Sequence, residues 1–291
     1  MLDKIKGGLL GVAIGDALGA TTEFMSPDEI KKELGRVTSI IGGGVWKVEP
    51  GETTDDTAMT LAVARGIIAN SDDPIEEIGK RFLQWRDTKP KDIGITISIA
   101  FENYQGDWFE AAENTHHQLN GKSAGNGSLM RCLPIALAYS DVKRMDEITD
   151  LQSKMTHYDE LASEACIIYN RMARRLLAGE ELNTSILSEV KNTRYELGIY
   201  EQPDCPPDGF VVHSMKWVLY WLLTSETFED VVIGATNMGN DSDTIAAIAG
   251  GLKGIEVGFS NLPNEYKNSL LDRVQLEEIA ADLSVIRDTR F

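Results

Sequence analysis

The chain has 291 residues, 42% of them hydrophobic and 25% charged, a balance typical of a water-soluble globular protein. Its 46 acidic and 28 basic side chains give a net charge of −18, which argues against binding to nucleic acid or to anionic membrane surfaces. Three widely spaced cysteines form no CxxC pair and no Cys/His cluster, so neither a disulfide framework nor a structural zinc site is supported.

Near its start the chain carries two lysines and a short apolar run, which loosely imitates a secretory signal peptide. Asp16 interrupts this run and glycines recur in it, so we interpret it as a buried helix in close contact with another helix or a ligand. Further on, Val211–Leu223 is also apolar, but it contains His213 and Lys216 and is too short to cross a bilayer. We therefore predict a cytoplasmic protein without a membrane partner.

Apolar residues recur at helical spacing along much of the chain. Such stripes run through residues 10–17, 59–66, 211–222 and 245–252. Several of these helices are apolar nearly all round, which indicates that they are central and buried. Gly35–Ile40 is the one short segment that we expect to be extended.

Two glycine- or proline-rich segments, residues 42–51 and 192–209, are predicted loops. Apolar helices of similar composition flank both, so neither is expected to link two domains. The sequence therefore predicts an all-α fold, in a single compact domain spanning residues 1–291.

Two clusters of acidic and hydroxyl residues, Thr54–Thr57 and Asp241–Thr244, each open an apolar helix rich in small residues. A single acid or threonine at such a position can be explained by helix capping alone, because it complements the helix dipole. Two carboxylates so close together repel each other unless a cation lies between them, and the pattern occurs twice. If the fold joins the two helix ends, their oxygens form a pocket suited to Mg²⁺ or Mn²⁺. A metal-dependent enzyme is therefore our leading hypothesis.

A glycine-rich stretch, Gly125–Ser128, precedes a helix expected around Leu129–Leu137. Its backbone N–H groups would suit phosphate oxygens, although glycine turns are common without a ligand. Arg131 could neutralise a diphosphate or form a structural ion pair. Trp46 could line a pocket mouth, but packing under its own loop is the interpretation that we favour.

Five motifs, in order along the chain, resemble those of the ADP-ribosylglycohydrolase family, and in particular those of the bacterial dinitrogenase-reductase-activating glycohydrolases. They are Gly15-Asp16-Ala17-Leu18-Gly19 with Glu23-Phe24, then Thr54–Thr57, Gly125–Arg131, Thr156-His157 and Asp241–Thr244. The resemblance implies an all-α fold with a centre of two Mg²⁺ or Mn²⁺ ions. It also implies hydrolysis of the glycosidic bond that joins ADP-ribose to an acceptor, most often an arginine of a protein.

Carried over residue by residue, the resemblance assigns the metal ligands Thr54, Asp55, Asp56, Asp241, Asp243 and Thr244. It assigns binding of the diphosphate and ribose to Gly125, Asn126, Gly127, Ser128 and Met130, and contact with the distal part of ADP-ribose to His157. The catalytic candidates are Glu23, Asp55, Asp92 and Asp243. Among these, Glu23 would be a metal ligand or a gating acid, and Asp92 would lie near the ribose and its leaving group, although it could also merely cap the next helix.

Two positions depart from the family pattern, because Asn240 stands where a glycine is common and Ser242 stands where a threonine is common, which keeps the hydroxyl. Asparagine tolerates unusual backbone angles, so we expect the turn to be kept. All the implied metal ligands are present, which argues against a non-catalytic binding or structural relative. A di-metal phosphohydrolase is a rival, but such enzymes more often use histidine ligands and none is near either cluster.

The acceptor is left open by the sequence. Arginine on a protein is preferred, and serine, DNA and O-acetyl-ADP-ribose are the alternatives, so nucleic acid enters only as a modified substrate. A small ADP-ribosyl compound would serve equally as substrate, and a monomer is the default expectation.

Overall fold

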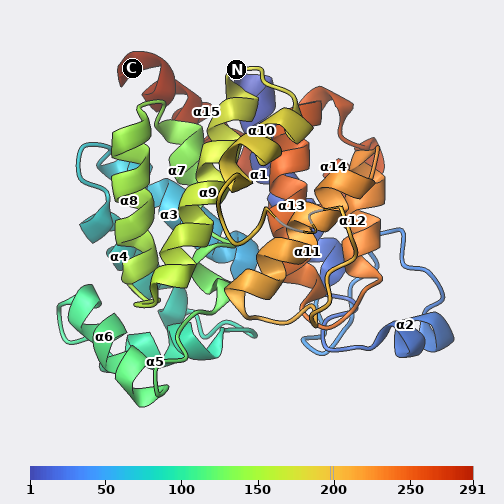
Figure 1. Cartoon of the computed structure of the whole chain (residues 1–291), viewed down its shortest axis with the longest axis horizontal. Coiled ribbons are helices and arrows are strands. Elements are labelled where there is room, and N and C mark those ends of the chain that lie inside the picture. The colour runs from blue at the N-terminus through green and yellow to red at the C-terminus, as the bar shows by residue number, and fades with distance from the viewer. Residues whose placement is uncertain (197, 199, 291) are drawn as a thin grey trace.

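The computed structural model describes residues 1–196, 198 and 200–290, and it is helical through most of them (Figure 1). Over these residues, backbone pairing of the β type is limited to two isolated bridges, Gly43 with Val48 and Gly125 with Phe210. The predicted all-α fold is therefore confirmed. None of the described helices combines the length and the apolar character needed to span a membrane.

The α-helices follow one another as α1 (Leu2–Gly19), α2 (Pro27–Glu33), α3 (Asp55–Ala69), α4 (Ile75–Asp87), α5 (Ile95–Asn103), α6 (Trp108–Gln118), α7 (Leu133–Ala138), α8 (Val142–Lys154), α9 (Glu160–Leu177), α10 (Leu182–Val190), α11 (Val211–Thr224), α12 (Phe228–Thr236), α13 (Ser242–Val257), α14 (Asn264–Ser269) and α15 (Arg273–Arg290). Two short 3₁₀ helices are η1 (Asn126–Ser128) and η2 (Phe259–Asn261).

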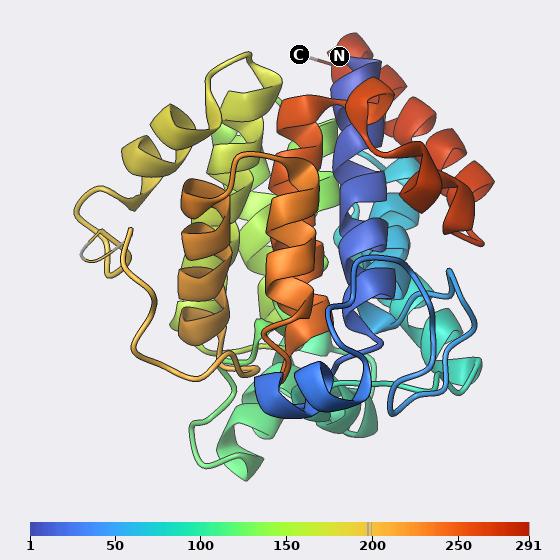
Figure 2. The ribbon, with the colours of Figure 1, turned by 90° about the vertical axis from the view of Figure 1, so that its right-hand side faces the viewer.

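Helices α1 and α13 lie side by side in the centre and run antiparallel (Figure 2). Glycines make their contact unusually close, because a Cβ added to Gly11 would stand 2.1 Å from the carbonyl oxygen of Gly250. At the end of α1, a Cβ on Gly19 would stand 2.4 Å from the Cα of Asp243. The close approach expected from the glycines is therefore between helices, and it brings the end of α1 against the start of α13.

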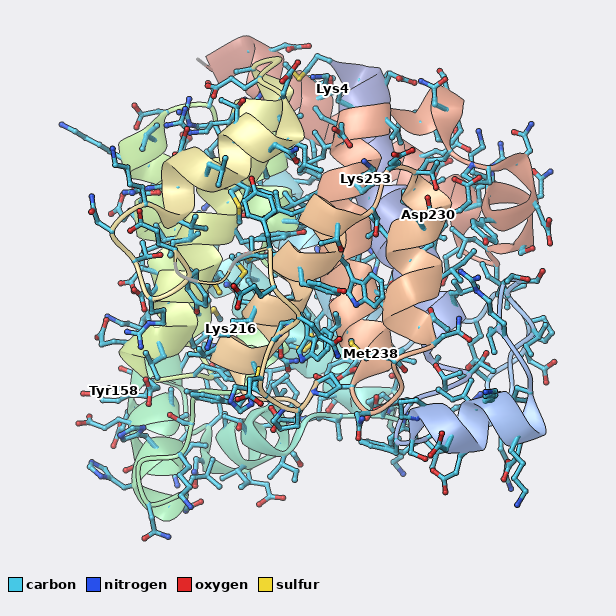
Figure 3. All side chains as sticks on the ribbon, turned by 45° about the vertical axis from the view of Figure 1, so that its right-hand side comes forward. Lys4, Tyr158, Lys216, Asp230, Met238 and Lys253 are labelled. Atoms are coloured by element: carbon cyan, nitrogen blue, oxygen red, sulfur yellow. The ribbon has the colours of Figure 1, made fainter. Side chains whose placement is uncertain are left out.

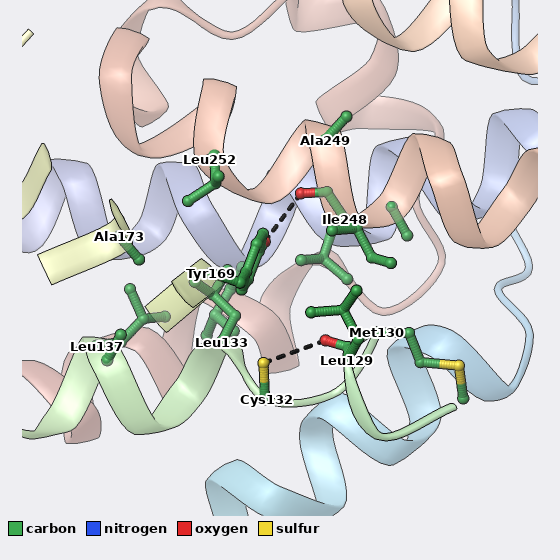
Figure 4. Packing of buried hydrophobic residues seen from close by; sticks show 14 of the residues in the cluster. Leu129, Met130, Cys132, Leu133, Leu137, Tyr169, Ala173, Ile248, Ala249 and Leu252 are labelled. Atoms are coloured by element: carbon green, nitrogen blue, oxygen red, sulfur yellow. Dashed lines mark hydrogen bonds between the residues drawn. The ribbon is translucent and has the colours of Figure 1, made fainter. Parts of the chain in front are cut away.

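The remaining helices surround this pair and complete one hydrophobic interior. Tyr169 of α9 packs there against Leu133 and Leu252, and its hydroxyl donates a 2.8 Å hydrogen bond to the carbonyl of Ile248 (Figure 4). Cys132 is buried beside them, as expected for a core cysteine. Polar side chains cover the outside of the bundle (Figure 3).

Two expectations about local structure were wrong. Gly35–Ile40 forms no strand, because the N–H and the carbonyl of Val37 pair with the side chain of Asn237 instead of with another strand. The helix expected at Leu129–Leu137 begins only at Leu133, after η1 and a turn. The loop predicted at 192–209 contains no helix at its described positions, and residues 197 and 199 lie outside the described residues.

Candidate active site

The two acidic clusters meet at the N-termini of α3 and α13. Thr244 donates a 3.2 Å hydrogen bond from its hydroxyl to Asp56, 188 residues away in the sequence. Asp55, Asp56, Asp243 and Thr244 are all buried, and Asp241 is half-buried. The fold thus joins the two helix ends, which was the condition for the predicted all-oxygen pocket.

Neither helix start is capped by its own N-cap side chain. Thr54 and Asp241 occupy the N-cap positions, and neither side chain bonds to the backbone of its helix. Thr54 instead donates its hydroxyl to Asp16, at 2.9 Å, and Asp241 accepts a 2.5 Å hydrogen bond from the amide of Asn126. A capping role therefore does not account for these two residues.

Asp16 is a site residue that our sequence interpretation did not assign a role. It lies fully buried on α1 and accepts hydrogen bonds from the N–H and the hydroxyl of both Thr54 and Thr57, at 2.5 to 3.1 Å. Thr57 is the third residue of α3, so Asp16 caps this helix from another one. The signal in the sequence was a single acid in an otherwise apolar, glycine-rich helix.

The carboxylates of the cluster repel one another. Burial, and then the charges of neighbouring acids, raise the pKa of Asp55, Asp56 and Asp243 above the usual range. The Oδ1 atom of Asp56 is buried without a hydrogen-bond partner. Unpaired buried oxygens among crowded acids are what a divalent cation would satisfy, and the donor set of carboxylates and hydroxyls suits a hard ion. The residues therefore fit a metal centre.

A second group of acids borders this cluster. Glu23, Asp92 and Asp243 each place one carboxylate oxygen within 4.8 Å of the others. Burial and neighbouring carboxylates raise the pKa of both Glu23 and Asp92 to about 7. Asp92 does not cap the next helix, because Gly94 is the N-cap of α5.

Trp46 lies in the pocket rather than under its loop, so the packing that we favoured was wrong. Its indole N–H donates to Glu23, and its ring meets Phe24 edge-on at 6.2 Å. Phe24 itself has a left-handed backbone with φ of 61°. Its N–H donates to the carbonyl of Asn240, and the N–H of Asn240 donates to the carbonyl of Met25. Asn240 has φ of 54°, which confirms that asparagine accommodates the turn.

A cavity of about 570 Å³ extends from these acids to the glycine-rich stretch. Of the predicted substrate-binding residues, five line it: Gly125, Asn126, Gly127, Met130 and His157. Ser128 is fully buried and does not line it, because its hydroxyl bonds to Ser153 and to the thiol of Cys166. Three residues of the glycine-rich stretch, Gly125, Asn126 and Gly127, thus face the cavity, while Ser128 points into the core.

His157 closes the cavity wall beside the two glycines. A Cβ on Gly125 or Gly127 would stand 3.2 or 3.1 Å from its ring, so the glycines make room for it. Burial lowers the pKa of His157 to about 3, which keeps the imidazole neutral. Arg131 is fully buried and does not line the cavity, and it forms no ion pair among the described residues. Its guanidinium bonds to Gln152 and Thr156 below the stretch.

Comparison with known proteins agrees with this geometry. The model of the ADP-ribosylglycohydrolase family matches residues 1–290. The chain belongs to the ADP-ribosylglycohydrolase family. The chain is 31% identical over 277 residues to the ADP-ribosyl-[dinitrogen reductase] glycohydrolase of Rhodospirillum rubrum, covering 94% of this chain and 92% of that one.

Two further relatives support this family assignment. ADP-ribosylarginine hydrolase Tri1 of Serratia proteamaculans is 27% identical, over 97% of this chain and 79% of its own. A solved structure described as an ADP-ribosylglycohydrolase-related protein complex superposes with a TM-score of 0.85 and 28% identity, over 98% of both chains. The resemblance drawn from the sequence motifs is thereby confirmed, and the chain is an ADP-ribosylglycohydrolase, a hydrolase of glycosyl bonds.

Proposed function

We propose that this glycohydrolase releases ADP-ribose from modified arginine side chains of proteins, with two Mg²⁺ or Mn²⁺ ions as cofactor. One observation carries the choice of arginine. The cavity lining holds six carboxylates and, among the described residues, neither lysine nor arginine. The roles of the individual site residues, the cytoplasmic location and the monomeric state belong to the same proposal.

The charges of the site favour a cationic leaving group. Two divalent ions would carry four positive charges, which the four carboxylates among the proposed ligands match: Asp55, Asp56, Asp241 and Asp243. Three acids of the lining then remain, and one of them, Asp208, is hydrogen-bonded to His213 at 2.9 Å. Glu23 and Asp92 are thus the uncompensated acids beside the proposed ligands. A guanidinium group binds carboxylates through paired hydrogen bonds, whereas a serine hydroxyl is neutral and acetate is negative. Arginine is therefore the acceptor that these two acids suit.

The proposed ligands are these four carboxylates with the hydroxyls of Thr54 and Thr244. When bound, the ions would supply Lewis-acid polarisation of the ribose hydroxyls and of water. The Thr54 hydroxyl donates its hydrogen bond to Asp16, so the lone pairs of its oxygen are left for a cation. This arrangement explains why a threonine and not only acids belongs to the set.

Cleavage of the glycosidic bond develops positive charge on the sugar ring, of the oxocarbenium type. Asp55 and Asp243 lie beside the cavity and would stabilise that charge. Glu23 is held by the Trp46 indole and is outside the proposed ligand set, so it is the carboxylate placed to take a proton from the attacking water. Asp92 would bind the guanidinium as it leaves.

The test is release of free ADP-ribose from an arginine-linked and a serine-linked peptide of the same sequence, with Mg²⁺, with Mn²⁺ and with EDTA. We expect faster release from arginine, lost in EDTA. Asp92→Asn should slow the arginine substrate at least about tenfold relative to the serine substrate, because it weakens a charged hydrogen bond. Asp141→Asn, at the remote N-cap of α8, is the control. Faster release from serine would contradict the proposal.

A further inference from the structure

Three hollows follow one another around the N-terminus of α3. The active-site cavity shares Trp46, Asp55 and Asp92 with a smaller cavity of about 200 Å³, here called the connecting cavity. The connecting cavity in turn shares Thr54 and Trp85, among others, with a groove of about 550 Å³ along α3 and α4, here called the α3–α4 groove. The three hollows therefore adjoin one another, from the catalytic acids to the outer surface.

The position of this path suits the acceptor. A glycosidic bond has ADP-ribose on one side and the acceptor on the other. If the glycine-rich stretch binds the diphosphate, the leaving group lies at the opposite end of the active-site cavity, beside Trp46 and Asp92. The connecting cavity begins at these same two residues. The acceptor side chain is therefore expected to lie in it.

The walls of the connecting cavity match an arginine side chain. Trp46, Trp85 and Pro90 supply apolar surface for an aliphatic stem, and Asp92 stands at the inner end for a guanidinium. Glu52 and Lys91 also line this cavity and pair with each other at 2.7 Å. Trp85 is braced edge-on against Phe101, with ring centroids 6.2 Å apart. The cavity thus offers apolar sides and an anionic end.

The α3–α4 groove has the opposite charge preference. Arg65 and Arg81 both line it, and neither forms an ion pair within the described part of the chain. Arg81 donates to the side chain of Gln84, and its Nε atom is buried without a partner. Two carboxylates, Glu52 and Asp272, also line the groove. Glu52 pairs with Lys91 at 2.7 Å, so the unpaired charges of the described lining are two arginines against Asp272. This excess of positive charge favours an acidic occupant.

We propose that the substrate protein lies across these two hollows, with its modified arginine in the connecting cavity and acidic residues beside that arginine in the α3–α4 groove. This inference rests on the proposed function. It identifies the partner as a protein segment in which an arginine is flanked by aspartate or glutamate. Charge complementarity and the residues shared with the active-site cavity are its two supports.

The experiment compares two peptides that carry ADP-ribosyl-arginine, one with acidic and one with uncharged flanking residues. The readout is the ratio of their kcat/KM values, so a general loss of activity cancels. The wild type should prefer the acidic peptide by about tenfold, the effect of two exposed ion pairs. In Arg65→Glu/Arg81→Glu the ratio should fall to one or invert. Arg36→Glu, an exposed arginine that lines none of these hollows, should keep the wild-type ratio.

Arg65→Glu alone keeps the experiment valid if the change at Arg81 unfolds the protein, since Arg65 is exposed. A wild-type ratio of one, with free ADP-ribosyl-arginine still cleaved, would overturn this inference and leave the proposed function standing. An unchanged ratio in the arginine variants would do the same. If the wild type cleaves no arginine-linked substrate at all, the proposed function fails and the inference falls with it.

Discussion

The starts of α3 and α13 look alike in sequence, yet different parts of the protein support them. At α3, Asp16 from α1 bonds the N–H and hydroxyl groups of Thr54 and Thr57. At α13, the N–H of Thr244 is bonded by Asp243, its own neighbour. Thus the start of α3 is capped by a side chain of another helix, Asp16, whereas the start of α13 is capped by Asp243, a proposed ligand within the same helix.

Two helices outside the site are capped by their own N-cap side chains. α2 and α12 each begin with a complete capping box, built on Ser26 with Glu29 and on Thr227 with Asp230. A cap of this kind contributes about 1 kcal/mol to stability. Thr54 and Asp241 forgo that contribution, because their side chains bond to Asp16 and to Asn126 instead. The contrast separates acids that start a helix from acids that serve the site.

The largest effect is expected from removing one proposed ligand on either side. Asp56→Ala and Asp243→Ala should each lower kcat at least about a hundredfold, because each removes charge from the reacting centre, while ADP-ribose still binds in part. Turnover and calorimetric ADP-ribose binding measure the two effects. Asp230→Ala, an acid that only caps α12, should lower stability and leave kcat unchanged. Near-normal turnover in both ligand variants would rule out the two-metal proposal.

The variant Asp16→Asn tests the capping of α3 by Asp16. The amide of this variant would turn an N–H₂ group toward N–H and hydroxyl donors that now share one carboxylate, so Thr54 and Thr57 would lose the bonds that orient the start of α3. Loss of such a supporting hydrogen bond typically lowers metal affinity by about 10- to 100-fold. Titration with Mn²⁺, followed by electron paramagnetic resonance, measures this affinity.

The control for that experiment is Thr149→Val, which removes a buried hydroxyl of α8 that accepts a 2.8 Å hydrogen bond from the side chain of Asn170 on α9. It should lower thermal stability without changing Mn²⁺ affinity. If both variants weaken Mn²⁺ binding equally, Asp16 acts only through general stability.

The pH dependence of the metal-free protein follows from the acids beside the cluster. Folding raises the pKa of Glu23 from 4.5 and of Asp92 from 3.8, in both cases to about 7. The folded protein therefore holds these protons to higher pH than the unfolded chain, and their contribution to stability is lost as pH rises toward and through 7. In EDTA, the melting temperature should fall between pH 5.5 and pH 8. Saturating Mg²⁺ should reduce this fall, and equal slopes with and without Mg²⁺ would contradict a cation between these carboxylates.

The smallest effect concerns the turn before α13. Asn240→Ala places a residue with a Cβ at φ of 54° without the local hydrogen bonding of asparagine, and should cost about 1 kcal/mol of unfolding free energy. Asn240→Gly, the residue common in the family, should be neutral or stabilising. Urea denaturation measures both variants. A stable alanine variant would show that the turn does not need this residue type.

Local patterns in the sequence were enough for the helices and for most of the candidate site. The 3.6-residue periodicity depends only on neighbours along the chain, so it predicted the all-α fold. The motifs that carry the family resemblance predicted residues that do line one cavity, from Glu23 and Asp55 to Asp243. Gly35–Ile40 was misjudged because a side chain, Asn237, satisfies its backbone, and no local pattern shows this.

What the sequence alone determined is which oxygen-bearing side chains open α3 and α13, and that glycines let helices approach closely. What only the tertiary structure decided is how they meet: Asp56 bonded to Thr244 across 188 residues, Asp16 capping α3, and Trp46 turned onto Glu23. The reason is physical. Helix formation follows from short-range periodicity. The contacts named above depend instead on the packing of α1 against α13, in which glycine and apolar faces far apart in the sequence are buried against each other.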